Sequence, residues 1–230
     1  PFATPDPWFS RYDRAAIPPP VRRDGELDDL APHFARTFDP GVPTSGRHGK
    51  TKMTDAQVAE IVAITWGMVS FVDEQAGRIL DALDRLGLAD TTAVVFMADH
   101  GDMLGDHWLM NKGPFHFDGL LRVPLIYRVP RTPGGRVIAS LASHLDFVPT
   151  ICDLAGMAPP EYGPPPGLPP AAPDQLRALP GRSLAPVIRG EAASVQDAIA
   201  IENDEDYLGL RLRTLVTQTH QLTLYVGEDG

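Results

Sequence analysis

The sequence predicts an α/β fold, with a mostly parallel sheet flanked by helices and a small antiparallel sheet at the carboxyl end. Residues 54–86 show a long helical pattern, and the apolar, β-branched run 91–97 follows within a few residues. A long helix, a short turn and a buried strand form half of a helix-crossover unit, which implies parallel strands. Three short strand patterns beyond residue 196 predict the antiparallel sheet.

Composition sets the class of protein and excludes some partners. The chain has 230 residues, 43% of them hydrophobic, which is enough for one large domain or a domain with a small subdomain. The formal net charge of -10 argues against general nucleic-acid binding. We expect no membrane segment, because no apolar run approaches the length needed to cross a bilayer. Oligomerisation and a cytoplasmic or periplasmic location stay open.

The first half of the chain is predicted to hold an arm and a long helix. Residues 1–53 are rich in proline and charge, so we interpret them as an irregular arm. Thr54 and Gln57 have the form of a capping box at the start of the helix. Apolar residues then recur in steps of three and four, and Gly87 is a natural stop.

The second half is predicted to complete the core and begin a subdomain. Residues 122–129 form a second short strand, and residues 144–154 form a helix. The segment 157–181 is a proline-rich surface loop. We therefore divide the chain into the arm, an incomplete α/β core over 54–195 and the start of an antiparallel subdomain over 196–230. The subdomain strands are predicted at 198–202, 210–217 and 221–226.

The residues most suggestive of chemistry follow the predicted strand 91–97. Asp99 and His100 stand where open α/β sheets bind ligands, and a carboxylate with an imidazole suits a metal ion. Gly101 would let the backbone turn tightly beside the ion. Lys112, between Asn111 and Gly113, could bind an anionic oxygen near the metal. Together these residues indicate work on a negatively charged ester.

Other polar residues have structural explanations that compete with functional ones. His116 is a candidate substrate contact. Asp102, Asp106 and His107 could orient the metal ligands, but loop-closing hydrogen bonds are the simpler interpretation for the two aspartates. Two further pairs have structural interpretations: an ion pair between Asp118 and Arg122, and helix capping by His144 and Asp146.

Four segments of the chain resemble the sulfatase family of the alkaline-phosphatase-like superfamily when taken in combination. The resemblance runs from about Phe2 to the carboxyl end and is closest to the bacterial branch of type I sulfatases, choline-sulfatase-like enzymes and phosphonate monoester hydrolases. The segments are Phe71–Leu80, Ala98–His107, Asn111–Pro114 and Arg122–Ile126.

This resemblance implies that Asp99 and His100 ligate one divalent cation, usually calcium and sometimes manganese, and that Lys112 contacts the transferred group. The family nucleophile is a formylglycine made from the first residue of Cys/Ser-x-Pro-x-Arg. The single cysteine, Cys152, is followed by Asp-Leu-Ala, so this chain holds no nucleophile. The family's two adjacent amino-terminal aspartates are absent too. We interpret the chain as a carboxyl-terminal fragment with half of the metal site, inactive by itself.

The predicted function is hydrolysis of a small sulfate ester by the full-length protein. A phosphonate monoester or phosphodiester hydrolase is one rival, because the same residues would serve it. A two-metal phosphatase would need more strand-end ligands, for which only His144 and Asp146 are available. A non-catalytic relative of the same fold is the third alternative.

Overall fold

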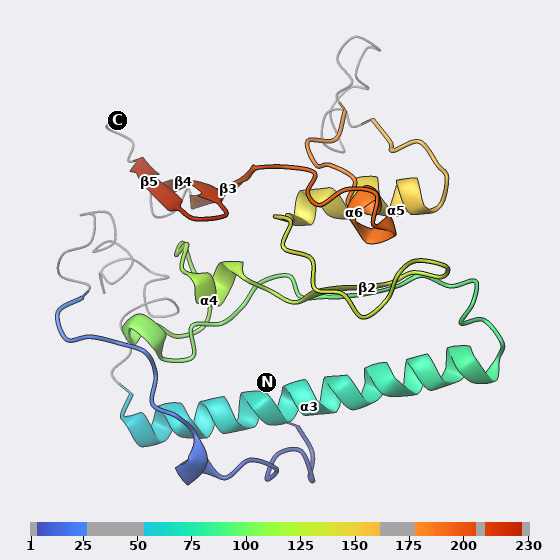
Figure 1. Cartoon of the computed structure of the whole chain (residues 1–230). Coiled ribbons are helices and arrows are strands. Elements are labelled where there is room, and N and C mark those ends of the chain that lie inside the picture. Colours follow the sequence, from blue (N-terminus) through green and yellow to red (C-terminus); the bar gives the residue numbers. More distant parts are fainter. Residues whose placement is uncertain (1–3, 27–52, 162–177, 206–209, 227–230) are drawn as a thin grey trace, which may run out of the picture. The chain divides into compact units, whose positions relative to one another are not determined.

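The computed structural model describes residues 4–26, 53–161, 178–205 and 210–226 (Figure 1). The chain divides into two compact units, each treated by itself below. The first unit comprises Pro1–Ile126, Glu202–Arg213 and Thr223–Gly230, and the second comprises Tyr127–Ile201 and Thr214–Leu222. Most of the predicted proline-rich loop and residues 27–52 of the predicted arm lie outside the described residues.

The long helix α3 spans Asp55–Arg85, as predicted (Figure 1). Thr54 and Gln57 form the expected capping box, in which each side chain accepts a hydrogen bond from the other residue's backbone amide. The helix ends at Leu86, and Gly87 follows with a φ of 67°, a left-handed conformation that glycine adopts without strain.

Residues 4–17 of the predicted arm pack against α3. Trp8 meets Phe71 edge to face at 4.9 Å, and the Tyr12 and Ser70 hydroxyls are hydrogen-bonded at 2.8 Å. The chain comes closest at Gly67, where a Cβ atom would lie 2.2 Å from the Trp8 carbonyl oxygen. Gly67 therefore lets the arm reach the helix backbone.

The length and composition of α3 bear on the expectation of no membrane segment, which stays a prediction. An 18-residue window of α3 has a mean hydropathy of 1.3, so by these criteria alone the helix could cross a membrane. Its apolar residues differ in how far the rest of the described chain covers them. One set is buried: Val58, Val62, Ala63 and Gly67. A second set, here called the apolar stripe, is exposed: Trp66, Val69, Val72 and Ile79. The core helix of a globular protein can meet the same criteria of length and composition.

Two short strands that follow α3 in the sequence pair with each other. Strand β1 spans Val94–Met97 and pairs with β2, which spans Leu125–Arg128. Both were expected to be buried, but they are partly exposed, and Phe96 and Ile126 have 40% and 59% of their surface open. This differs from the expectation because, in the described chain, each of the two strands has only the other as a neighbour.

A small apolar cluster lies under the segment that joins β1 to β2. Its buried members are Met103, Leu109, Phe115 and Leu120, with Phe117 and Tyr225 packed against them. The one-turn helix α4, Asp118–Leu121, contributes Leu120. The segment from β1 to α4 is thus anchored by buried side chains spaced along its length.

The second unit contains the predicted helix near residue 150. It forms as a 3₁₀ turn, η3 (His144–Asp146), followed by α5 (Phe147–Leu154), and Gly156 ends it with a φ of 68°. The side chains of Ser143 and Asp146 cap η3, which confirms the capping role of Asp146. A further short helix, α6 (Ala185–Arg189), was not predicted.

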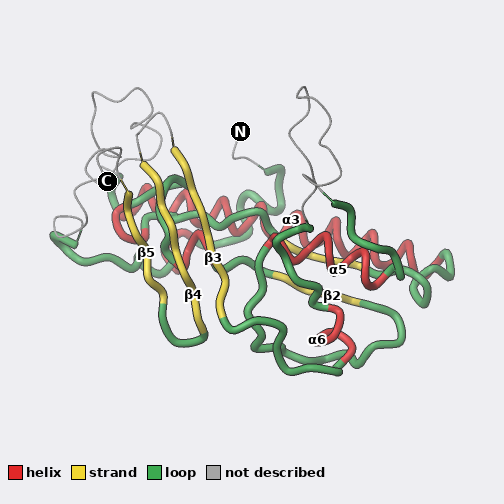
Figure 2. Tube along the Cα trace, turned by 90° about the horizontal axis from the view of Figure 1, so that it is seen from above, coloured by secondary structure: helices red, strands yellow, loops and turns green. Residues whose placement is uncertain are grey.

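The three predicted carboxyl-terminal strands form one sheet in the order β3–β4–β5 (Figure 2). They span Ala198–Glu205, Leu210–Thr217 and Gln221–Val226, so only the first is longer than expected. Alternation along β4 turns Leu212 and Thr214 inward and leaves Arg211 and Arg213 free to pair with Asp204 of β3.

Candidate active site

The end of β1 is held close to α4, and this determines where Asp99 and His100 lie. The Gly101 amide donates a hydrogen bond to the Leu120 carbonyl at 3.0 Å. A Cβ atom on Gly101 would lie 1.8 Å from the Gly119 carbonyl oxygen. Gly101 is needed here because the backbones approach each other, rather than for the tight turn predicted from the sequence.

The structure brings together the three residues that the sequence singled out. Asp99 Oδ2 lies 3.3 Å from His100 Nε2, and the Lys112 ammonium donates to the same nitrogen at 2.8 Å. His100 Nδ1 lies 2.8 Å from the Gly101 carbonyl oxygen, which can only accept. The proton is therefore assigned to Nδ1, and Nε2 presents its lone pair beside the Asp99 carboxylate.

Charge and hydrogen bonding favour the ionised form of Asp99. The backbone amide of His100 donates to Asp99 Oδ1 at 2.9 Å and is the main cause of a lowered Asp99 pKa. The nearby positive charge of Lys112 lowers the pKa further. The Asp99 side chain is 84% exposed and that of His100 is 39% exposed, so both are accessible to an ion or a ligand.

These donors suit a divalent cation such as calcium or manganese, but they form only part of a ligand set. An ionised carboxylate oxygen and an imidazole nitrogen at this spacing could share one ion. A backbone carbonyl on the far ring nitrogen is the usual support for a metal-bound histidine. Among the described residues, no three His, Cys, Asp or Glu side chains gather in a group that could hold a metal.

The loop between His100 and Lys112 has an unusual backbone. Four of its residues that are not glycine have positive φ: Leu104 at 46°, His107 at 53°, Trp108 at 63° and Asn111 at 60°. The left-handed conformation costs such residues roughly 1–2 kcal/mol each. The Met103 amide donates to the Asn111 carbonyl at 3.0 Å, which draws the ends of the loop together. This strained loop, residues 103–111, ends directly before Lys112.

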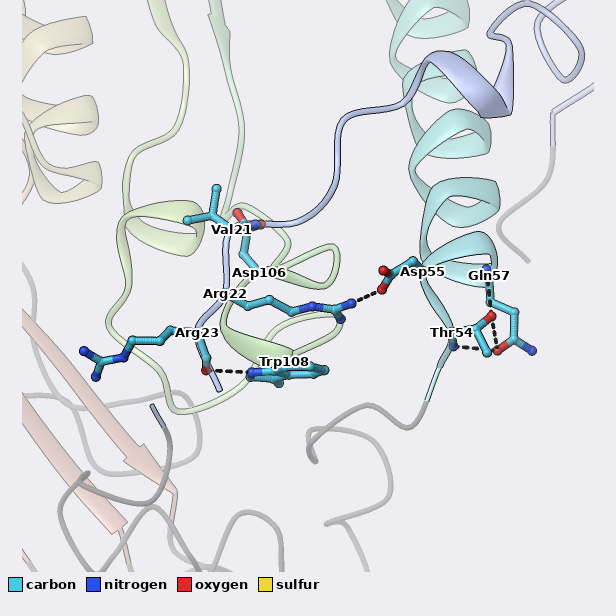
Figure 3. A network of polar contacts seen from close by, with 8 residues as sticks. All are labelled: Val21, Arg22, Arg23, Thr54, Asp55, Gln57, Asp106 and Trp108. Carbon is cyan, nitrogen blue, oxygen red and sulfur yellow. Dashed lines mark hydrogen bonds and ion pairs between the residues drawn. The ribbon is translucent and has the colours of Figure 1, made fainter. Parts of the chain in front are cut away.

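Asp102 and Asp106 make the loop hydrogen bonds that the sequence suggested. Asp102 Oδ1 accepts from the Leu104 amide at 3.0 Å. Asp106 Oδ1 accepts from the Val21 amide at 2.7 Å and so ties the loop to the amino-terminal segment (Figure 3). His107 Nδ1 lies 3.1 Å from Glu26 Oε2, a partner that the sequence gave no signal for, because 81 residues separate the two.

The remaining candidates lie apart from the cluster of Asp99, His100 and Lys112 or have structural partners. His116 is only 7% exposed, and burial lowers its pKa; its contact with substrate stays a prediction. Asp118 and Arg122 form the expected ion pair at 3.6 Å. Cys152 is a half-buried free thiol on α5.

Asp146 does not support the two-metal alternative. Its carboxylate is 1% exposed and accepts hydrogen bonds from the Ser143 amide, the Arg182 amide and the Gln196 side chain, each at 2.8 Å. These donors occupy both carboxylate oxygens. The carboxylate therefore serves to hold the second unit together.

The fold is that of the alkaline-phosphatase-like superfamily, and comparison with known proteins identifies the family. The sulfatase family model matches residues 30–157, more than half of the chain. The chain belongs to the sulfatase family. Choline-sulfatase from Rhizobium meliloti is 34% identical over 132 residues, which cover 57% of this chain and 24% of that protein.

Solved structures confirm the predicted fold. The phosphonate monoester hydrolase from Silicibacter pomeroyi matches 100% of this chain and 48% of its own, with a TM-score of 0.73 and 24% identity. The enzyme of the same name from Agrobacterium radiobacter matches 98% of this chain and 47% of its own, with a TM-score of 0.69 and 26% identity. The chain thus spans about half of these structures and about a quarter of the choline-sulfatase.

Proposed function

We propose that the full-length protein hydrolyses a small sulfate ester with the help of one divalent cation, most readily calcium. The observation that carries the proposal is that Asp99 Oδ2 and the Lys112 ammonium both lie within 3.3 Å of His100 Nε2. Membership of the sulfatase family supports sulfate as the transferred group. Asp99 and His100 would be two of the cation's ligands, and the bound cation would polarise the ester oxygens.

Lys112 would hold the transferred group. Its ammonium now donates to His100 Nε2, the atom that the cation would need. A lone pair cannot serve both, so Lys112 would release the imidazole and turn its charge to an anionic ester oxygen. There it would bind the sulfate group and offset the charge that develops on the leaving oxygen.

The nucleophile is the part of the chemistry that this chain does not supply. Its sequence contains no Cys/Ser-x-Pro-x-Arg, the site at which formylglycine forms in the family. We therefore expect the formylglycine and the other metal ligands to come from sequence outside these 230 residues. The isolated chain should bind the cation weakly and hydrolyse no ester.

Phosphonate ester hydrolysis is the second candidate, since the similar structure from Agrobacterium radiobacter bears the name phosphonate monoester hydrolase. The test compares hydrolysis of p-nitrophenyl sulfate and a phenylphosphonate ester by the protein expressed from its complete gene, with calcium or manganese. Preference for sulfate, lost in Asp99→Asn and Lys112→Ala, supports the first candidate, and preference for phosphonate supports the second. No metal-dependent turnover of either ester would reject both and favour a non-catalytic relative.

The competition between Lys112 and the cation makes a prediction that does not depend on turnover. Lys112→Met removes both the competing hydrogen bond and a positive charge next to the ion. Calorimetry should therefore show tighter calcium binding in Lys112→Met than in the wild type, even though any ester hydrolysis falls steeply. Weaker or unchanged calcium binding would show that Lys112 and the cation do not share His100.

A further inference from the structure

The amino-terminal segment Val21–Glu26, here called the clasp, binds the strained loop, residues 103–111, which ends directly before Lys112. Its backbone supplies three of the contacts, and Figure 3 draws the residues of two of them, Val21 with Asp106 and Arg23 with Trp108. The Val21 amide donates to Asp106 at 2.7 Å, and the Val21 carbonyl accepts from the His107 amide at 2.9 Å. The Arg23 carbonyl accepts from the Trp108 indole nitrogen at 3.0 Å.

Side chains of the clasp add contacts on the same residues. The Arg22 guanidinium lies over the Trp108 ring at 4.0 Å and pairs with Asp55 at the start of α3. Glu26 Oε2 accepts from His107 Nδ1 at 3.1 Å, while Glu26 Oε1 accepts from the Arg23 amide. Burial would raise the pKa of Glu26, but the hydrogen bonds from Arg23 and His107 outweigh it and lower the pKa, so Glu26 stays ionised.

The clasp holds the loop at the positions where its backbone is strained. His107 and Trp108, both with positive φ, are the residues that Glu26 and Arg23 bind. On its other face the His107 ring stacks on Phe117 at 4.3 Å and 13°. Strained residues persist only where their surroundings over-determine them, and they cluster at functional sites. The clasp on one side and Phe117 on the other provide these surroundings.

We propose that Glu26 and His107 are positioning residues that set the place of Lys112 relative to His100. The loop closes through the bond from the Met103 amide to the Asn111 carbonyl, so its shape determines where the next residue, Lys112, stands. If the clasp is lost, the loop relaxes and the ammonium moves. The catalytic meaning of this proposal rests on the proposed function, in which Lys112 binds the transferred group.

The test uses variants of the protein expressed from its complete gene. Glu26→Ala and His107→Ala remove the hydrogen bond, whereas Glu26→Gln keeps an acceptor and His107→Asn keeps a donor that tolerates positive φ. Glu60→Ala is the matched control, because Glu60 pairs with Arg14 at 3.0 Å and so ties the same amino-terminal region to α3 without contacting the loop.

We expect Glu26→Ala and His107→Ala to lower kcat/KM for the sulfate ester at least tenfold and to weaken inhibition by inorganic sulfate. Glu26→Gln and His107→Asn should keep most of the wild-type kcat/KM and of the inhibition by inorganic sulfate. Glu60→Ala should change neither quantity more than twofold. The proposal is overturned if Glu26→Ala retains wild-type kcat/KM. It is also overturned if Glu60→Ala lowers the urea midpoint of unfolding as much as Glu26→Ala does and lowers kcat/KM by the same factor.

Hydrogen exchange separates this proposal from the proposed function. Amides of residues 104–111 should exchange at least tenfold faster in Glu26→Ala than in the wild type or in Glu60→Ala. If the wild type hydrolyses no ester, the proposed function fails, yet the exchange result still tests whether the clasp holds the loop. Unchanged exchange in Glu26→Ala would overturn the clasp even in an active enzyme.

Discussion

Two aspartates show how the surroundings of a single residue decide its role. Asp99 is exposed, stands beside a histidine lone pair and a lysine, and can take a cation. Asp146 is buried, and three N–H donors occupy its two oxygens. In the sequence the two look alike, because each aspartate lies within two residues of a histidine. Their difference lies in donors contributed by residues 36 and 50 positions away from Asp146.

Asp146→Ala is expected to destabilise the protein by about 3 kcal/mol, because it leaves buried N–H donors without an acceptor. Urea unfolding followed by circular dichroism would measure the change. The matched control is Asp118→Ala, which removes the exposed pair with Arg122 and should cost at most about 0.5 kcal/mol. Equal effects of the two substitutions would show that the Asp146 network does not stabilise the fold.

His116 is expected to make the free energy of unfolding fall as the pH drops below about 6.5. Burial lowers its pKa in the folded state, whereas in the unfolded chain the pKa is near 6.5. As the pH falls through 6.5, the unfolded state takes up a proton that the folded state does not, so the free energy of unfolding decreases. His116→Gln should flatten this part of the curve in urea titrations.

At the scale of elements, α3 contains two glycines whose surroundings differ. Gly67 faces the Trp8 carbonyl, and a Cβ atom there would lie 2.2 Å from it, whereas Gly77 has nothing within 4 Å. Alanine favours helices over glycine by roughly 0.5–1 kcal/mol. Gly77→Ala should therefore raise the free energy of unfolding by that amount.

Gly67→Ala should instead lower the free energy of unfolding, by about 1–3 kcal/mol, because the arm must move away from the helix. The comparison is sharp, since both substitutions make the same chemical change within one helix. Thermal and urea unfolding of the two variants would measure it. A stabilising Gly67→Ala would mean that the arm does not pack on α3 as described.

At the scale of the whole molecule, the sequence predicted local features better than long-range ones. The capping box at Thr54, the stop at Gly87 and the strands 210–217 and 221–226 depend on neighbouring residues and were confirmed. Helix α6 was missed, because five residues are too few to show a helical period. The partner of His107 could not be predicted, since nothing local distinguishes Glu26 from the other acidic residues of the predicted arm.

The same contrast applies to the exposure of the strands and of α3. A strongly apolar segment predicts burial, but the sequence does not say whether residues of the same chain or of another molecule bury it. In this chain the apolar stripe stays exposed: Val69, Val72 and Ile79 have 62%, 54% and 63% of their surface open. An exposed row of large apolar side chains on one helix face marks a contact surface.

The apolar stripe is expected to make the isolated 230-residue chain bind a hydrophobic dye and self-associate. Replacing Val69, Val72 and Ile79 together by serine should cut dye fluorescence several-fold and favour the monomer in analytical ultracentrifugation. A matched variant with serine at Val137, Leu145 and Met157 removes exposed apolar residues that lie outside α3 and should have a smaller effect. If both triple variants reduce dye fluorescence and self-association equally, the apolar stripe does not mediate the self-association. If the wild-type chain binds neutral lipid vesicles through α3 and the stripe variant does not, the stripe contacts lipid rather than protein.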